Sequence, residues 1–171
     1  LFQKISYRTS LAYSKIITDK NYYDKSVHGK SQLLSKIRHY ITNGYNNIVV
    51  SVAPFHLATH VSSIIDEYPN VNFIVDFRDP WVENKTSYGY YSLTKKRQHK
   101  EQISEKMVIE KFNYVVTVSN TITKNLRIKY PKSDANFLTI PNGFDSEDYV
   151  NLKNKICINS EIRLVFSGTF Y

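Results

Sequence analysis

Short apolar segments alternate with amphipathic ones along the middle of the chain, and this alternation restricts the fold more than any other feature. Residues 48–53, 71–77 and 114–118 are compact apolar runs rich in β-branched side chains, which is typical of buried strands. Longer segments with helical spacing of their apolar residues separate them. A strand–helix–strand order requires right-handed crossovers between parallel strands. The sequence therefore predicts an α/β fold built on a parallel sheet.

The helices of this pattern have recognisable ends. Ser31 is in position to cap a helix that stops at Asn43-Gly44, where a left-handed glycine fits. Ser119 or Asn120 can cap another helix, which Pro131 ends. The helices carry their apolar residues on one stripe each: Leu33, Leu34, Ile37, Tyr40 and Ile41; Leu57, Val61, Ile64 and Ile65; and Ile122, Leu126 and Tyr130. A long helix at 95–112, short strands at 137–140 and 162–166, and a strand at 48–53 covered on both faces complete the prediction.

The composition of the chain narrows the classes of partner and site that it can have. The formal charge of +8 suits nucleic acid, an anionic membrane surface or phosphorylated ligands, and it equally suits a basic solvated surface. The basic residues are spread along the chain, with one dense run at 95–97. The single cysteine, Cys157, excludes a disulfide within the chain and lacks partners for a cysteine metal site. No apolar run is long enough to span a membrane, and no signal peptide is visible.

Polar side chains follow the ends of the predicted strands, where parallel sheets bind ligands. Arg78 and Asp79 come directly after one strand; the guanidinium can hold a phosphate, and the carboxylate can act as a base or bind hydroxyls. The alternative is a structural ion pair of Arg78 with Asp76 or Asp79, beneath Trp81. His56 follows another strand and can bind a ligand oxygen, or can simply begin a helix.

Several common catalytic motifs are missing. His56 and His60 have zinc-like i, i+4 spacing, but the glutamate and the third ligand of that motif do not occur, so a metal is not expected. The glycine-rich dinucleotide and P-loop motifs are absent, as is the nucleophile elbow of serine hydrolases. Asn142-Gly143 follows a predicted strand and fits a simple turn. Gly168 follows the last predicted strand, where it could approach a phosphate or only form a turn.

Five segments in order resemble the family-4-type glycosyltransferases, which are retaining, nucleotide-sugar-dependent enzymes with two Rossmann-like domains, the GT-B architecture. The segments are Ser51-Val52-Ala53-Pro54-Phe55-His56, Val75-Asp76-Phe77-Arg78-Asp79-Pro80-Trp81, Tyr114-Val115-Val116-Thr117-Val118-Ser119, Ile140-Pro141-Asn142-Gly143-Phe144-Asp145 and Leu164-Val165-Phe166-Ser167-Gly168-Thr169. The second and fourth of these, in this order, are the most specific. The resemblance covers roughly residues 45 to 171.

The resemblance implies a domain organisation and a set of site residues. Residues 1–145 would form the acceptor-side Rossmann-like domain without its first strand, and residues 146–171 a connector and the first strand of the donor-binding domain. Asp79 and Arg78 would be catalytic, although Arg78 stands where the family often has histidine. The substrate-binding residues would be His56, Trp81, Ser119, Asn142, Gly143 and Gly168.

The resemblance also implies partners and location. The expected partners are a nucleotide-sugar donor and a glycan or lipid-linked acceptor for cell-surface polysaccharide synthesis, without cofactor, metal or nucleic acid. The expected location is cytoplasmic, with peripheral contact to the anionic inner face of the plasma membrane as an option. The Tyr-rich segment 87–92 would be an acceptor-side loop, and the chain alone is expected to be inactive. A sugar-nucleotide epimerase of GT-B architecture and a basic nucleic-acid-binding domain are the alternatives.

Overall fold

A computed structural model gives the structure of the chain, and it describes residues 26, 29–83 and 90–149. The chain divides into two units, residues 1–141 and residues 142–171. The first unit holds the sheet and the helices. Of the second unit the described part is residues 142–149, which contain one 3₁₀ turn, Ser146–Tyr149.

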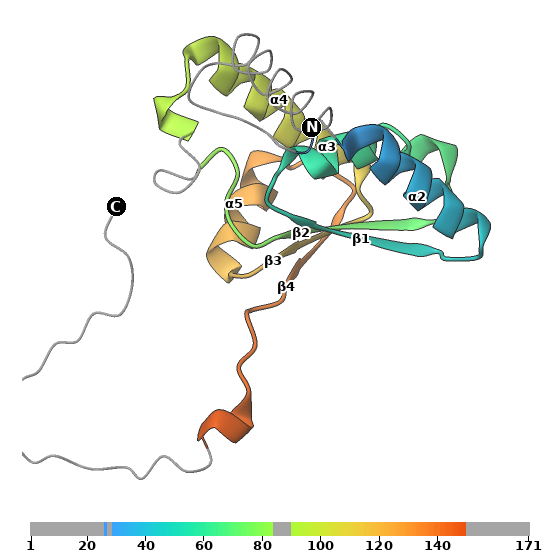
Figure 1. Cartoon of the computed structure of the whole chain (residues 1–171). Helices are drawn as coiled ribbons and strands as arrows, with labels where there is room; N and C mark the ends of the chain where they lie inside the picture. The colour runs from blue at the N-terminus through green and yellow to red at the C-terminus, as the bar shows by residue number, and fades with distance from the viewer. Residues whose placement is uncertain (1–25, 27–28, 84–89, 150–171) are drawn as a thin grey trace, which may run out of the picture. The chain divides into compact units, whose positions relative to one another are not determined.

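The centre of the first unit is a parallel sheet in the order β1-β2-β3-β4, the same as the order in the chain (Figure 1). The strands are β1 (Asn47–Val52), β2 (Asn72–Phe77), β3 (Tyr114–Thr117) and β4 (Asn136–Thr139). Val52, Phe77, Thr117 and Thr139 are paired across the sheet, so all strands end at one edge. The segments that follow the strands therefore leave from a common carboxyl edge.

The helices are α2 (Lys30–Thr42), α3 (His56–Ser62), α4 (Lys95–Lys111) and α5 (Asn120–Lys129). Short 3₁₀ turns lie at Ile65–Glu67 and Tyr90–Ser92. Thr94 and Ser119 cap α4 and α5 with their hydroxyl oxygens, which accept hydrogen bonds from the Arg97 and Ile122 N–H groups. Gly44, at φ +93°, follows α2 in the left-handed conformation that glycine tolerates without a steric penalty.

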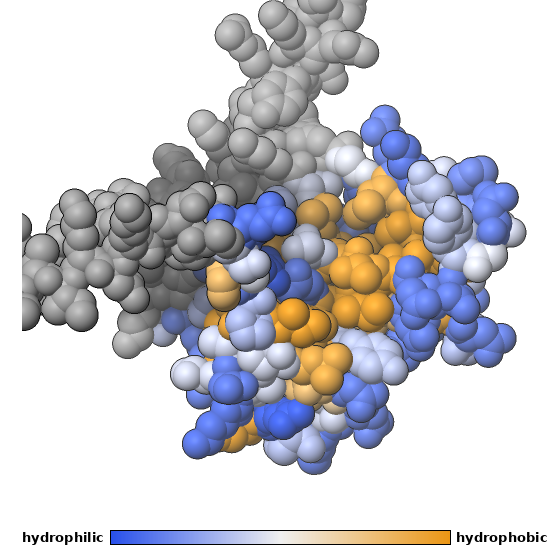
Figure 2. Space-filling view, turned by 90° about the horizontal axis from the view of Figure 1, so that it is seen from below, coloured by the Kyte–Doolittle hydropathy of each residue, from blue (hydrophilic) through white to orange (hydrophobic). Residues whose placement is uncertain are grey.

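One face of the sheet is buried and the other is largely open. The row of paired residues Val50, Val75, Val115 and Phe137 is buried, while the adjacent row contains Val49, which is 64% exposed. Leu138 is 45% exposed and belongs to the same open face. Seen from below the view of Figure 1, apolar side chains gather on this side of the domain (Figure 2). Right-handed crossovers in the order β1 to β4 place every connecting helix on one face, which explains the asymmetry.

The predicted α/β class, the parallel sheet and four of the five strands are confirmed. Three details are wrong. Position Ser31 lies inside α2, which begins without a side-chain cap after Gly29. The strand predicted to be covered on both faces, β1, is exposed at Val49 and Ser51, because it lies at the edge of the sheet with helices on one side. Tyr40, placed on the apolar stripe of α2, is 50% exposed.

Several predictions fall outside the described residues. They are the strand at 162–166 with Gly168, the connector beyond residue 149, and the Tyr-rich segment up to residue 89. The boundary predicted after residue 145 stays a prediction. Among the described helices none combines the length and the apolar character needed to cross a bilayer.

Candidate functional site

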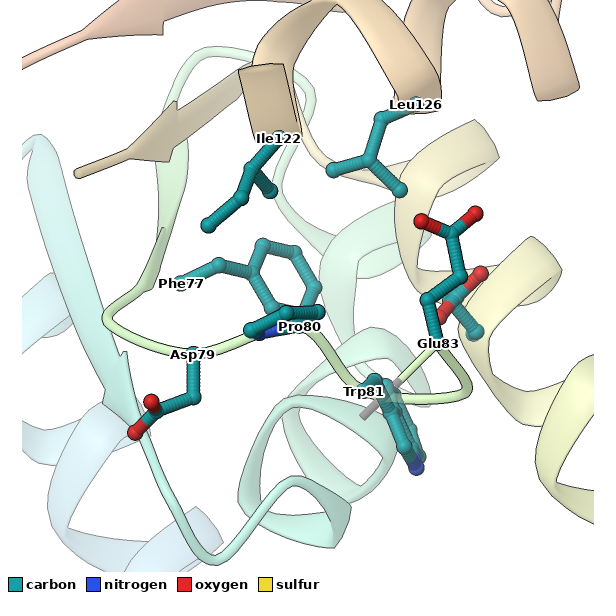
Figure 3. Close-up of a pocket in the computed structure, with 8 residues that line it drawn as sticks. Phe77, Asp79, Pro80, Trp81, Glu83, Ile122 and Leu126 are labelled. Carbon is teal, nitrogen blue, oxygen red and sulfur yellow. The ribbon is translucent and has the colours of Figure 1, made fainter. Parts of the chain in front are cut away.

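The segment after β2 turns sharply at Arg78 and Asp79 and then enters the core. Both side chains are partly exposed at the carboxyl edge, whereas Trp81 is only 4% exposed. The Asp79 carboxylate points away from the apolar side chains Phe77, Ile122 and Leu126, which gather behind the turn (Figure 3). The space between these apolar groups has room for about one water molecule. This gap is too small for a sugar.

Arg78 forms an ion pair with Asp76, which was the structural alternative to a ligand-binding role in the sequence analysis. Its Nη1 lies 3.4 Å from Asp76 Oδ1, and the Ser51 hydroxyl donates to Asp76 Oδ2 at 3.1 Å. The contact is long, and 38% of the Arg78 side chain remains exposed. Arg78 therefore pairs with Asp76 of β2 while its side chain stays partly exposed.

Two buried carboxylates of α4 fix the segment that carries Arg78 and Asp79. Glu101 accepts a hydrogen bond from Trp81 Nε1 at 2.8 Å, and Glu105 accepts one from the Val82 N–H at 3.1 Å. Both glutamates are 1% exposed. Because buried acceptors of this kind are costly to leave unpaired, these bonds hold the segment in one geometry.

His56 joins this arrangement from the end of β1. It begins α3, two residues after the cis peptide bond between Ala53 and Pro54. Its Nε2 lies 2.9 Å from Glu101 Oε2, and its ring lies edge-on to Trp81 with centroids 5.5 Å apart. The Trp81 indole stacks on Phe55 at 5.1 Å. The histidine and the tryptophan therefore share one buried carboxylate beneath the carboxyl edge.

The charge state of Glu101 follows from these contacts. Burial by itself raises the pKa of a carboxyl, but His56, Arg97 and the Trp81 N–H favour the ionised form and together outweigh burial. The result is a pKa for Glu101 below its ordinary value. Arg97 Nε lies 2.7 Å from Glu101 Oε1 as an ion pair, although its N–H lacks the alignment of a hydrogen bond.

This lowered pKa predicts an acid-sensitive fold. A carboxyl whose folded pKa is depressed adds stability above its unfolded pKa, and that stability is lost as pH falls through the folded pKa. We expect the free energy of unfolding to decrease as the pH falls below the ordinary pKa of a glutamate carboxyl and through the lower pKa of Glu101 in the folded chain. Glu101→Gln is expected to flatten this decrease. Urea denaturation at a series of pH values measures both curves. Equal slopes for the two proteins would contradict the expectation.

The remaining predicted site residues are less closely connected. Ser119 caps α5 at the end of β3, so it lies at the same edge as His56 and Arg78. Asn142 and Gly143 belong to the second unit and are exposed. Trp81 is buried in packing, and its contact with substrate stays a prediction. Among the described residues no group of three or more His, Cys, Asp or Glu side chains is arranged to hold a metal ion.

Sequence reasoning missed Arg97, Glu101 and Glu105. The signal was their spacing: positions 97, 101 and 105 follow one another in steps of four, and Val108 and Ile109 continue the same buried face of α4. Carboxylates at positions where an apolar side chain is expected mark buried polar contacts.

Comparison with known proteins gives no relative. No protein-family model, no curated protein and no solved structure matches the chain. The case for a function therefore rests on the motifs of the sequence and on the geometry of the carboxyl edge.

Proposed function

We propose that this chain is the acceptor-side part of a retaining, nucleotide-sugar-dependent glycosyltransferase of GT-B architecture, which adds sugars during cell-surface polysaccharide synthesis. The order of the five sequence motifs suggests the class. The observation that carries the proposal is the pre-organised carboxyl edge, where buried Glu101 and Glu105 hold the segment bearing Arg78 and Asp79. A fixed set of polar side chains on a rigid scaffold is what hydroxyl recognition requires.

Asp79 and His56 are the proposed contacts with the acceptor sugar. A carboxylate accepts hydrogen bonds from hydroxyl groups, and an imidazole can donate or accept them. Arg78 stays in the proposal as a cation beside the reacting groups, because its pairing with Asp76 leaves the side chain partly exposed. A guanidinium in this position can stabilise a phosphate that leaves with negative charge.

The proposal extends to the partners. The proposed donor is a nucleotide-sugar, and Gly168 would approach its phosphates, as the resemblance implies. Asn142 and Gly143 stay in the proposal as substrate-binding residues. The formal charge of +8 favours contact with an anionic membrane surface that carries a lipid-linked acceptor. Basic side chains and helix ends, in place of a metal, would neutralise the departing diphosphate.

Sugar binding by the purified chain tests the proposal. Saturation-transfer NMR with glucose, galactose, N-acetylglucosamine and rhamnose, as monosaccharides and short oligosaccharides, is expected to detect millimolar binding of at least one of them. Asp79→Ala is expected to weaken that binding about tenfold, because a hydrogen bond to a charged group is lost.

The control for this experiment is Glu110→Ala, since Glu110 is exposed on α4 and pairs with Lys106, one turn away on the same helix. This variant is expected to bind the same sugar as the unaltered chain does. Absence of binding to every sugar in the panel, with the chain folded by circular dichroism, would overturn the proposal.

A further inference from the structure

Glu101 is the meeting point of side chains from separate parts of the domain. His56 from the start of α3, Trp81 from the segment after β2 and Arg97 from the first turn of α4 all contact its carboxylate. The glutamate side chain is 2% exposed and that of His56 is 15% exposed. The Glu101 carboxylate is thus buried, and the more exposed His56 side chain contacts it directly.

The surroundings of His56 Nε2 determine which ring nitrogen carries the hydrogen in the neutral imidazole. Nε2 lies 2.9 and 3.1 Å from the Glu101 oxygens and 3.4 Å from Arg97 Nη2. An ionised carboxylate only accepts hydrogen bonds, and the pKa of Glu101 is lowered. The short contacts to the Glu101 oxygens therefore require a hydrogen on His56 Nε2. In the longer contact, Arg97 Nη2 and His56 Nε2 are then both donors that lie side by side.

We propose that Glu101 is a positioning residue for His56. Its carboxylate fixes the ring and the Nε2–H tautomer, so that Nδ1 holds the lone pair through which neutral His56 accepts a hydrogen bond from an acceptor hydroxyl. Arg97 keeps the carboxylate ionised. The contact with a sugar hydroxyl in this inference rests on the proposed function. The effect of Glu101 on the tautomer of His56 is independent of the proposed function.

Glu105 provides a matched control. It lies one turn further along α4 and is equally buried at 1% exposure. Its contacts are to the Val82 N–H, Lys129 and Tyr130 instead of His56. Glu101→Gln and Glu105→Gln therefore remove the same charge from the same helix, but only the first change reaches the imidazole.

The first measurement is made on the free protein. Nitrogen-15 NMR of the imidazoles, with His56→Gln to assign the signals among the five histidines, reports the tautomer above the pH at which the rings titrate. We expect the Nε2–H form of His56 to exceed the other form at least tenfold in the unaltered chain and in Glu105→Gln. In Glu101→Gln the two forms are expected to become comparable. The indole signal of Trp81, the single tryptophan, is expected to move in Glu101→Gln and to show that the same carboxylate was lost.

The outcomes separate the two proposals. An Nδ1–H form in the unaltered chain would overturn the positioning role, even if Glu101→Gln failed to fold. An unchanged tautomer in folded Glu101→Gln would overturn it as well. The second measurement is binding of the sugar identified by saturation transfer, which is expected to weaken about tenfold in Glu101→Gln. If the tautomers behave as expected and no sugar binds, the positioning role stands and the proposed function fails.

Discussion

Phe73→Ala is expected to lower the free energy of unfolding by about 3–5 kcal/mol. Phe73 lies near the start of β2, on the buried face of the sheet, and is 0% exposed. Its ring meets Phe112, after the end of α4, edge-on with centroids 6.4 Å apart. Truncation leaves a cavity between the sheet and the helix layer that the surrounding strands can fill only in part.

Urea denaturation followed by circular dichroism measures this loss. Ile128→Ala is the control, because it also removes a large apolar side chain but from an exposed position of α5, at 67% exposure. The control is expected to change the free energy of unfolding by less than about 0.5 kcal/mol. Similar losses for the two variants would show that Phe73 does not pack as the structure has it.

Glu105→Leu is expected to lower the free energy of unfolding by about 3–5 kcal/mol, although leucine is the more apolar side chain. Glu105 Oε1 lies 2.6 Å from Lys129 Nζ and 2.6 Å from the Tyr130 hydroxyl, and Oε2 accepts from the Val82 N–H. Removing the carboxylate leaves an amide and a hydroxyl without their buried acceptor. It also takes the nearer of two counter-charges from the partly buried Lys129 ammonium, whose other carboxylate partner, Glu83, is 4.0 Å away.

Tyr130→Phe separates the hydroxyl from the rest of this cluster. Burial and the nearby Glu105 raise the pKa of Tyr130, so the hydroxyl stays protonated and donates to the carboxylate. Losing that one bond is expected to cost about 1.5–3 kcal/mol, less than the loss of Glu105. Glu110→Leu, an exposed change on the same helix, is expected to cost less than about 0.5 kcal/mol. A Glu105→Leu variant as stable as Glu110→Leu would contradict the assigned contacts.

The local pattern of the sequence was sufficient for the elements of the sheet. The β-branched runs predicted the strands because such residues are favoured where a strand is buried, and turn residues bounded them. Ser119 was one of two predicted caps of α5, with Asn120 as the alternative, because its hydroxyl can accept a hydrogen bond from a backbone N–H; it accepts that of Ile122 at 3.3 Å. These are short-range effects, and a short stretch of sequence contains all the groups involved.

The same kind of reasoning failed where distant segments meet. Val49 has the same side chain as Val50, yet it is 64% exposed and Val50 is 8% exposed. The difference depends on which face the crossover helices cover, and that follows from the order of the strands in space. No local property of a valine contains this information.

The sequence by itself determined an α/β chain with parallel strands and polar side chains after each strand, among them His56, Arg78 and Asp79. Only the tertiary structure decided that Glu101, 45 residues from His56 and 20 from Trp81, lies between them as a shared acceptor. In sequence Glu101 is one charged residue of a polar helix. It becomes a buried carboxylate with specific partners only when α4 packs against α3 and the end of β2, because a charge inside a protein has to find its hydrogen bonds there.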